Sequence, residues 1–254
     1  MAYDGRPFDG WQSQPSGNTI QDYIQLAIVS ICSEASGIQG SGRTDSGVSA
    51  DAQVAHFDVP TSWRMDAVAW LKALNTKLPA SIRIMECEQV DSEFHSRFSA
   101  TEKVYGYRIF HGPVLPPLLS GLVWHQPRLD VAALQSAMPV FIGKHHFKAF
   151  SANRNDGKDD GRDTLREIRS IQFREHEGPL IEVEICGNGF LYKMVRFLIG
   201  SGVRMAEGKL TVETVERLLN DPDCSEKAPF CAPADGLRLK IVNYHGSVTV
   251  NSGD

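Results

Sequence analysis

At 254 residues, of which 42% are hydrophobic, the chain is long enough to bury an ordinary core in one large domain or two small ones. Its five cysteines form no C-x-x-C pair, and an odd number is typical of reduced thiols rather than of a disulfide framework. No apolar run approaches the roughly 20 residues that span a bilayer, and the first residues lack the basic and apolar regions of a signal peptide. Composition therefore predicts a soluble, cytoplasmic protein and argues against a membrane-spanning or disulfide-bonded secreted one.

The charge is unevenly distributed along the chain. The formal net charge of −5 argues against a nucleic-acid partner, because lysine and arginine contacts with phosphates supply most non-specific affinity. Residues 96–170, however, carry 11 basic and 7 acidic groups, whereas residues 1–95 carry 6 and 12 and residues 171–254 carry 9 and 12. This basic segment fits two interpretations, a solvated surface with ordinary ion pairs or an RNA-binding surface.

The first 95 residues predict a mixture of helices and strands. Apolar residues recur at helical spacing from Thr19 to Ala35, with Thr19 as the N-cap and Gly37 as the stop signal. The other elements expected in this part are a helix from about Arg64 to Asn75 and strands over Ala52–Val59 and Ile82–Val90. The chain changes character after Phe94, so we place a domain boundary near residue 95, between an N-terminal half of 1–95 and a C-terminal half of 96–254.

Beyond residue 95 the pattern predicts further strands and helices around a polar loop. The expected strands are Lys103–Phe110, Leu165–Phe173, Leu180–Cys186 and Leu237–Tyr244. The expected helices are Val131–Ile142, one that begins near Phe190 and one that begins near Thr211. The tract Ser151–Asp163, rich in Asn, Asp, Gly, Lys and Arg, predicts a mobile loop able to close over a ligand.

The polar string Arg43-Thr44-Asp45-Ser46 lies between two glycines, in the loop that joins the first helix to a strand. Loops of this kind hold reactive side chains on a rigid scaffold. The residues themselves leave three interpretations open: a simple Asp-Ser-Gly turn, an ion pair between Arg43 and Asp45, and a catalytic role for Asp45. Spacing alone favours the turn.

This loop, with a series of other segments, resembles the tRNA pseudouridine synthase A (TruA) family, whose loop motif is Gly-Arg-Thr-Asp-x-Gly-Val-His-Ala. The other matching segments follow the family's order and cover nearly the whole chain: Tyr3-Asp4-Gly5, Gly10-Trp11-Gln12-Ser13-Gln14, Thr19-Ile20-Gln21, Leu74-Asn75, Leu78-Pro79, Phe94-His95-Ser96-Arg97-Phe98-Ser99-Ala100, Tyr105-Gly106-Tyr107, Gly189-Phe190-Leu191, Met194-Val195-Arg196 and Ala232-Pro233-Ala234. One short motif can arise by chance, but an ordered set of this length is specific.

The chain departs from the family pattern at a few positions. Ser49 stands where the family usually has His, Lys103 where Arg is usual, and His146 where Asp is usual. These departures concern details of tRNA contact more than the reaction. Family members normally carry about one strand of residues before the Tyr-Asp-Gly signature, so we expect a short or missing edge strand.

The resemblance implies a fold and an activity. The implied fold is α+β, the pseudouridine synthase fold, with two ferredoxin-like halves whose sheets meet around a central cleft. The implied activity is that of an isomerase that converts uridine to pseudouridine in the tRNA anticodon arm (tRNA positions 38 to 40). It implies a homodimer that acts without a cofactor.

The resemblance also assigns roles to particular residues. Asp45 matches the family's essential nucleophile or base, and Arg196 matches the arginine that balances its charge. Tyr105 matches the tyrosine that stacks on the target base, and Arg43 matches the arginine that enters the RNA stack as the uridine turns out. Phosphate contacts are expected from Lys144, His145, Lys148 and the loop Arg154–Arg162.

Several alternatives remain open. A metal site at His145 and His146 is not expected, because no third ligand follows at a recognisable spacing. Phe8 and Trp11 are expected in the core rather than on RNA. The chain can also be an RNA chaperone of the same fold without turnover, or a glycoside hydrolase. A hydrolase needs a second acid near Asp45, for which Asp51 and Asp58 are candidates.

Overall fold

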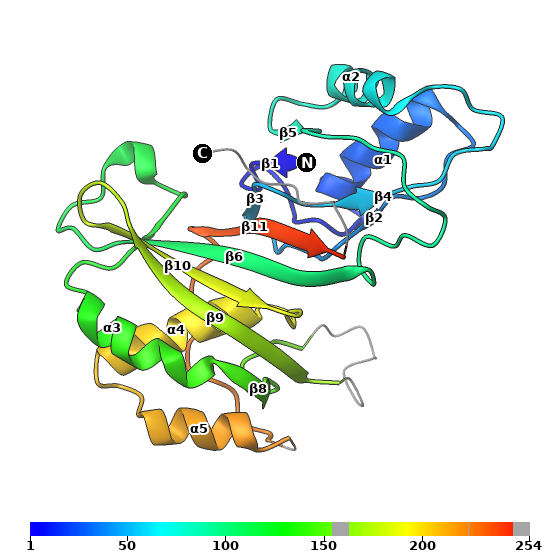
Figure 1. Ribbon diagram of the computed structural model, residues 1–254. Coiled ribbons are helices and arrows are strands. Elements are labelled where there is room, and N and C mark those ends of the chain that lie inside the picture. The colour runs from blue at the N-terminus through cyan, green and yellow to red at the C-terminus, as the bar shows by residue number, and fades with distance from the viewer. Residues whose placement is uncertain (154–162, 223, 246–254) are drawn as a thin grey trace. The chain divides into compact units, whose positions relative to one another are not determined.

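The computed structural model describes residues 1–153, 163–222 and 224–245, which form two compact units (Figure 1). Unit 1 comprises Met1–Lys103 and the chain from Arg238 onwards, and unit 2 comprises Val104–Leu237. The units therefore differ from the two contiguous halves expected from the sequence. The physical reason is that β11 (Leu237–Tyr244) pairs in parallel with β3 (Ser49–Ala50), so the last strand belongs to the first unit.

Unit 1 combines short strands with two helices. Its strand order is β5 (Ile82–Arg83), β1 (Ala2–Tyr3), β3 and β11. β1 pairs antiparallel with both β5 and β3, so this short strand lies inside the sheet rather than at its edge. A separate pair consists of β2 (Gln39–Gly40) and β4 (Ala55–His56).

The helices of unit 1 begin where capping side chains allow. In α1 (Ile20–Ile31) the hydroxyl of Thr19 accepts a hydrogen bond from the backbone N–H of Asp22, and in α2 (Ala67–Lys77) Asp66 caps Ala69. α1 buries Ile20, Ile24, Ala27 and Ile28 at the predicted spacing. It ends earlier than expected, because Cys32 is already extended while its N–H still reaches the carbonyl of Ile28.

Unit 2 is a sheet with helices on one face. Its strand order is β6 (Ala100–Phe110, which belongs to this unit from Val104 onwards), β10 (Leu180–Gly187), β9 (Leu165–Glu175) and β8 (Gly143–His146), with β7 (Trp124–His125) parallel to β6. The helices are α3 (Val131–Ala137), α4 (Met194–Ala206) and α5 (Val212–Asn220), with single 3-10 turns at Pro117–Leu119 and Met138–Phe141. Figure 1 shows α3 and α4 side by side beneath the sheet.

The side chains of β10 alternate between an apolar and a charged face. Ile181, Val183 and Ile185 belong to the core of unit 2. Glu182 and Glu184 are also buried, each near an arginine: Glu184 lies 2.8 Å from Arg174, and Glu182 lies 3.5 Å from Arg108. Buried carboxylates need such partners, because an unpaired charge away from water costs several kcal/mol.

The α+β class predicted from the sequence is confirmed, as are the long strands and all five helices. The predicted strands Ala52–Val59 and Ile82–Val90 are wrong in extent, because each contains only two paired residues. The fourth helix begins at Met194 rather than near Phe190, since Lys193 adopts a left-handed conformation with φ of 60°. No helix among the described residues is long and apolar enough to cross a membrane.

Candidate active site

The Asp45 loop, residues 41–48, joins β2 to β3 in unit 1. Asp45 opens a tight turn, in which its carbonyl accepts a 3.1 Å hydrogen bond from the N–H of Val48. Gly47 has a φ of +80°, which the third position of such a turn needs and which a side chain would strain. The turn interpretation of Asp-Ser-Gly is therefore correct as a description of the backbone.

Residues 8–11 hold the loop backbone on both sides of Asp45. The carbonyl of Thr44 accepts a 3.0 Å hydrogen bond from the N–H of Trp11, and the carbonyl of Phe8 accepts from Ser46 Oγ at 3.2 Å. Gly10 lies so close that a Cβ there would be 2.7 Å from the Thr44 carbonyl oxygen. Phe8 and Trp11 are buried, as expected, and they contribute to this support.

A buried polar network lies beside the loop. The Tyr3 hydroxyl is 2.8 Å from Thr44 Oγ1, and Gln53 Nε2 donates to the carbonyl of Gly42 at 3.0 Å. Gln53 Oε1 accepts from Ser41 Oγ at 2.7 Å. Burial raises the pKa of Tyr3 to about 12, so this phenol is a neutral hydrogen-bonding group at physiological pH. Sequence reasoning missed Gln53, because nothing near it in the chain marks it as buried.

Two departures from the family pattern have defined places in this network. Ser49 Oγ accepts a 3.0 Å hydrogen bond from the N–H of Gly5. Lys103 Nζ donates to the carbonyl of Ser41 at 2.5 Å. Burial lowers the pKa of Lys103 to about 8, and repulsion from Arg97 adds to the effect. Lys103 is therefore a half-buried amine at the base of the Asp45 loop.

Arg43 differs from its neighbours in facing solvent. Its side chain is exposed, and within the described ranges it makes no hydrogen bond or ion pair. The Arg43–Asp45 ion pair considered from the sequence is thus not formed. Asp45 itself is half-buried and has other interactions.

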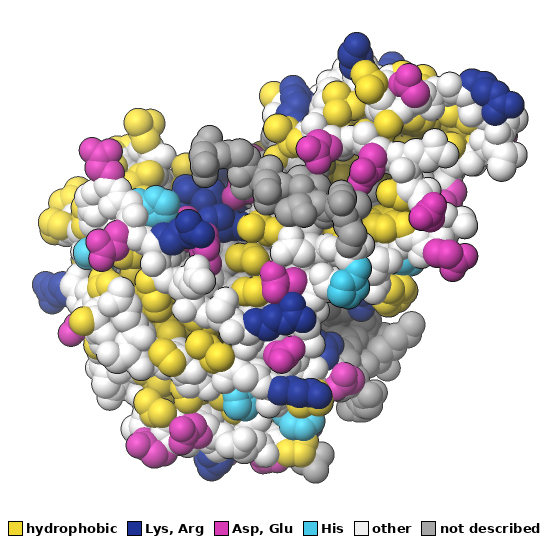
Figure 2. Space-filling view, viewed as in Figure 1, with side chains coloured by type: hydrophobic (Ala, Val, Ile, Leu, Met, Phe, Trp, Pro, Cys, Tyr) yellow, Lys and Arg dark blue, Asp and Glu magenta, His cyan; other side chains and the backbone are white. Residues whose placement is uncertain are grey.

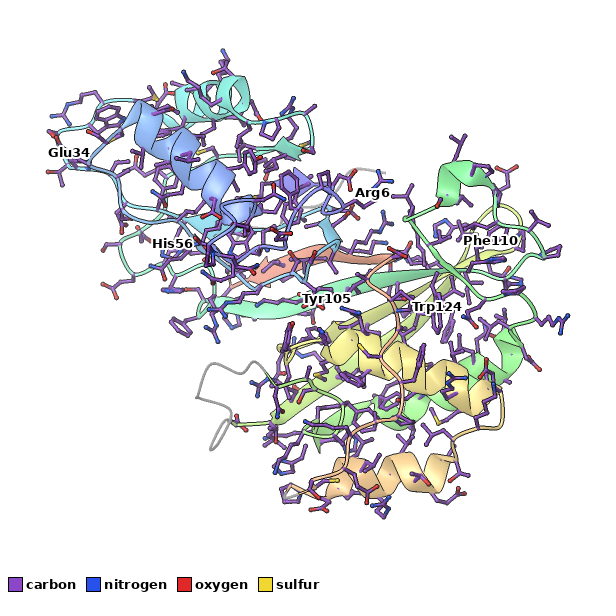
Figure 3. The ribbon with its side chains drawn as sticks, turned by 180° about the vertical axis from the view of Figure 1, so that it is seen from behind. Arg6, Glu34, His56, Tyr105, Phe110 and Trp124 are labelled. Carbon is purple, nitrogen blue, oxygen red and sulfur yellow. The ribbon has the colours of Figure 1, made fainter. Side chains whose placement is uncertain are left out.

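The other predicted catalytic residues lie in unit 2. Tyr105 is on β6, as labelled in Figure 3, and is 8% exposed, with its ring edge-on to Phe190 at 5.0 Å between centroids. Arg196 lies in the first turn of α4. Its Nε donates to the carbonyl of Ala232 at 2.7 Å, while the N–H of Ala232 donates to the Arg196 carbonyl at 3.0 Å.

Tyr107 lies on the same strand as Tyr105 and near Arg196. It follows Tyr105 at the strand spacing that puts both side chains on one face of β6, and its hydroxyl donates to the carbonyl of Pro233 at 2.9 Å. Burial raises the pKa of Tyr107 well above its usual value, although the nearby Arg196 acts in the opposite direction. Tyr107 and Arg196 thus hold the same segment, 232–233, from two sides. The sequence showed Tyr107 in a motif but gave it no role.

The residues from which phosphate contacts are expected also lie in unit 2. Lys144 and His145 lie on β8, where Lys144 is exposed opposite Glu167 and His145 Nε2 is 3.2 Å from the carbonyl of Ile142. Lys148 follows β8 and is half-buried. The loop Arg154–Arg162 lies outside the described residues. On the face shown in Figure 2, basic and acidic side chains are intermixed rather than gathered into one patch.

The structure thus places Asp45 and Arg43 in one loop of unit 1, and Tyr107 and Arg196 against the same segment of unit 2, in which β6 also carries Tyr105. The countercharge role of Arg196 and the stacking role of Tyr105 remain predictions.

Comparison with known proteins gives a consistent result. A family model described as "tRNA pseudouridine synthase" matches residues 1–99 and 137–245. "tRNA pseudouridine synthase A" of Akkermansia muciniphila is 45% identical, over 96% of this chain and 92% of the relative. "tRNA pseudouridine synthase A" of Maridesulfovibrio salexigens is 40% identical, over 96% and 88%, and "tRNA pseudouridine synthase A 2" of Clostridium perfringens is 39% identical, over 96% and 97%.

The close approach of Gly10 to the Asp45 loop gives a first prediction. Gly10→Ala combines a strained φ of +94° with the 2.7 Å contact to a backbone oxygen, so we expect a loss of about 2–4 kcal/mol in the free energy of unfolding. Gly17→Ala is the matched control, because Gly17 also has a positive φ but has open space around it, and we expect a loss of about 1 kcal/mol.

Urea unfolding measures both losses, and hydrogen exchange at the Val48 amide reports the loop directly. Faster exchange at Val48 is expected in Gly10→Ala only. Equal losses and equal exchange in the two variants would contradict the supporting role of residues 8–11.

Lys103 gives a prediction about pH. Its pKa is about 8 in the folded protein and near 10.5 in the unfolded chain, so the unfolded chain binds more protons between these values. The free energy of unfolding should therefore rise with pH from about 8 to 10.5, relative to the variant Lys103→Met. Chemical denaturation across this range measures the difference, with the exposed Lys72→Met as control. A difference that stays constant would show that Lys103 keeps its ordinary pKa.

Proposed function

Since the chain belongs to the tRNA pseudouridine synthase family, and is thus an isomerase that forms pseudouridine in tRNA, we propose that Asp45 is the residue that acts on the ribose and that the substrates are uridines of the anticodon arm. Support for the role of Asp45 comes from its loop. The backbone on both sides of this half-buried carboxylate is fixed by residues 8–11. A catalytic group needs a position of this kind, set by the scaffold rather than by its own flexibility.

The reaction explains which groups are needed. The N1–C1′ bond of uridine breaks, the detached uracil turns within the site, and a C5–C1′ bond forms while the C5 proton is lost and N1 gains a proton. Atoms and electrons balance without an oxidant, a reductant or a nucleotide, so no cofactor is proposed. The protein must act on the ribose with a carboxylate, hold the loose base, and move a proton.

Asp45 acts on the ribose as an ionised carboxylate, either by attack on C1′ or by removal of the 2′ proton. We propose Arg196 as its countercharge. An arginine about 4 Å away stabilises a carboxylate by on the order of 4 kcal/mol at an effective dielectric near 20. The hydrogen bond from Arg196 Nε to the carbonyl of Ala232 fixes the orientation of the guanidinium.

Tyr105 and Arg43 then act on the base and on its neighbours. Tyr105 provides an aromatic face for the target base in a site of low exposure. Arg43 is exposed, which suits insertion into an RNA stack as the uridine turns out, because planar stacking offsets part of the few kcal/mol that base flipping costs. Lys144, His145 and Lys148 contact phosphates farther along the tRNA.

The oligomeric state and the cellular compartment are also part of the proposal. A homodimer in which one tRNA touches both subunits follows the family pattern. All five cysteines are free thiols, which fits the reducing cytoplasm where tRNA is found.

Substitution of Asp45 tests the proposal. Asp45→Asn keeps the shape of the side chain but removes its charge, so we expect release of tritium from C5-labelled uridine in tRNA to fall at least about 1,000-fold while tRNA affinity changes little. Asp58→Asn is the control, because Asp58 is exposed, its carboxylate accepts a long 3.3 Å hydrogen bond from Ser36 Oγ, and it should be dispensable.

The same pair separates the alternatives. A glycoside hydrolase would need a second carboxylate near Asp45, and it would release free base or sugar rather than pseudouridine. Of the two candidates for that carboxylate, Asp51 lies 3.3 Å from Arg238, and Asp58 accepts a hydrogen bond from Ser36 at the surface. Wild-type protein that binds tRNA but releases no tritium would identify a binding protein of the same fold and would sink the catalytic role of Asp45.

The phosphate contacts are tested by charge reversal. The double variant Lys144→Glu, Lys148→Glu should weaken tRNA binding and reduce the slope of log Kd against log salt by about two. Lys72→Glu, Lys77→Glu is the control, because it makes the same change in net charge on exposed positions of α2 in the other unit. Equal effects of the two double variants would show a general charge effect and move the tRNA contacts elsewhere.

A further inference from the structure

Phe98 is the most exposed large aromatic side chain among the described residues. It is 75% exposed, whereas Tyr23, at 37%, packs edge-on against Phe8. A single exposed apolar residue needs no explanation in itself. Phe98, however, has a guanidinium beside it, since Arg97 Cζ is 5.5 Å from the Phe98 ring centroid and Arg97 is itself exposed.

The turn that carries Arg97 and Phe98 is held by several hydrogen bonds. The N–H groups of Arg97 and Phe98 both donate to His95 Nδ1, at 3.1 and 3.3 Å. Because Nδ1 accepts two hydrogen bonds, the ring proton is on Nε2, which donates to Gln39 Oε1 at 3.2 Å. The His95 ring also lies 4.3 Å from the Phe98 ring, between centroids. One histidine therefore fixes both the backbone and the ring.

The turn is anchored to the rest of unit 1 through Ser96. Ser96 Oγ donates to the carbonyl of Gln39 at 2.8 Å, and the carbonyl of Ser96 accepts from the Tyr244 hydroxyl at 2.7 Å. His56, labelled in Figure 3, contacts the same turn, with its Nδ1 2.9 Å from Ser96 Oγ and its ring 4.6 Å from that of His95. An exposed ring on such a support loses little conformational entropy when it binds a ligand.

The Arg97–Phe98 pair also lies close to the Asp45 loop within unit 1. Ser96 Oγ donates to the carbonyl of Gln39, two residues before that loop begins, and Lys103 Nζ donates to the carbonyl of Ser41 at its start. Arg43, two residues beyond Ser41, is exposed as well. The neighbourhood therefore offers two arginines and one open aromatic ring beside the loop that carries the reactive carboxylate.

We infer that Phe98 and Arg97 bind one unpaired nucleotide of the RNA substrate, with its base stacked on the Phe98 ring and its phosphate against the Arg97 guanidinium. This inference rests on the proposed function, because it supplies a subsite for the RNA that Asp45 modifies. A protein that binds single-stranded nucleotides without reading their sequence combines these two features, an aromatic face and a neighbouring cation. A mostly hydrated ring with a fixed backbone meets that requirement, whereas the exposed Leu26 and Val68 do not.

The test is equilibrium binding of an unmodified tRNA transcript in the Asp45→Asn background, at several salt concentrations. Phe98→Ala should weaken binding on the order of 10-fold with an unchanged salt slope, because stacking carries no charge. Phe98→Trp should retain wild-type affinity, and Phe98→Leu should bind as weakly as Phe98→Ala. Arg97→Ala should reduce the salt slope by about one, and Arg97→Lys should restore it.

Leu26→Ala is the matched control, since Leu26 is 68% exposed in the same unit but has no guanidinium beside it, and its affinity should equal that of the parent. Thermal unfolding should be unchanged in all of these variants. Wild-type affinity in Phe98→Ala or in Phe98→Leu would overturn the stacking role. A change in sedimentation mass with unchanged tRNA affinity would identify a protein interface instead and would also overturn it.

The outcome is separable from that of the proposed function. If the wild-type protein forms pseudouridine but Phe98→Ala binds tRNA normally, the subsite alone fails. If the wild-type protein neither binds tRNA nor forms pseudouridine, both fail together.

Discussion

The hydrogen bond from the N–H of Trp11 to the carbonyl of Thr44, with Gly10 packed beneath it, is the contact on which the position of Asp45 depends. It joins two segments that are far apart in sequence, and it leaves no room for a side chain at residue 10. The contacts of residues 8–11 fix the loop around the half-exposed Asp45 carboxylate. A group held in this way needs no reorganisation when a substrate arrives.

Neutral groups carry out most of this support. Tyr3, Thr44, Ser41 and Gln53 satisfy one another beside the loop, and Tyr107 satisfies the carbonyl of Pro233 next to the segment that holds Arg196. Burial raises the pKa of both tyrosines, so their hydroxyls remain donors throughout the physiological range. Neutral hydrogen-bonding groups cost less free energy to bury than an ion pair. They also place no additional charge next to the phosphate or the ribose of a substrate. The exception is Lys103, whose lowered pKa reflects the free-energy cost of removing a charged amine from water.

The sequence predicted those features that repeat locally. α1 was predicted because its apolar residues recur every three or four positions after a capping Thr19, and β11 because it alternates over eight residues. The strands β3, β4 and β5 contain two residues each, which is too short for any alternation, so their extent was not predictable. The placement of β11 in unit 1 was also missed, because it depends on pairing with β3 across the whole length of the chain. The candidate residues came from motif order, whereas Gln53 and Tyr107 acquire roles only through contacts distant in sequence.

The net charge of −5 is a weaker argument against RNA binding once the ion-pair partners of the charged side chains are considered. Several carboxylates are matched locally, as in Arg174–Glu184, Arg204–Glu207 and Arg217–Glu226, and such pairs present little net field at a distance. In the part of the chain that the structure describes, Arg43 and Arg97 make no ion pair, and both lie near the Asp45 loop. A phosphate within a Debye length of about 8 Å responds to these two cations rather than to distant acids. Local pairing, not total charge, therefore decides whether this surface attracts RNA.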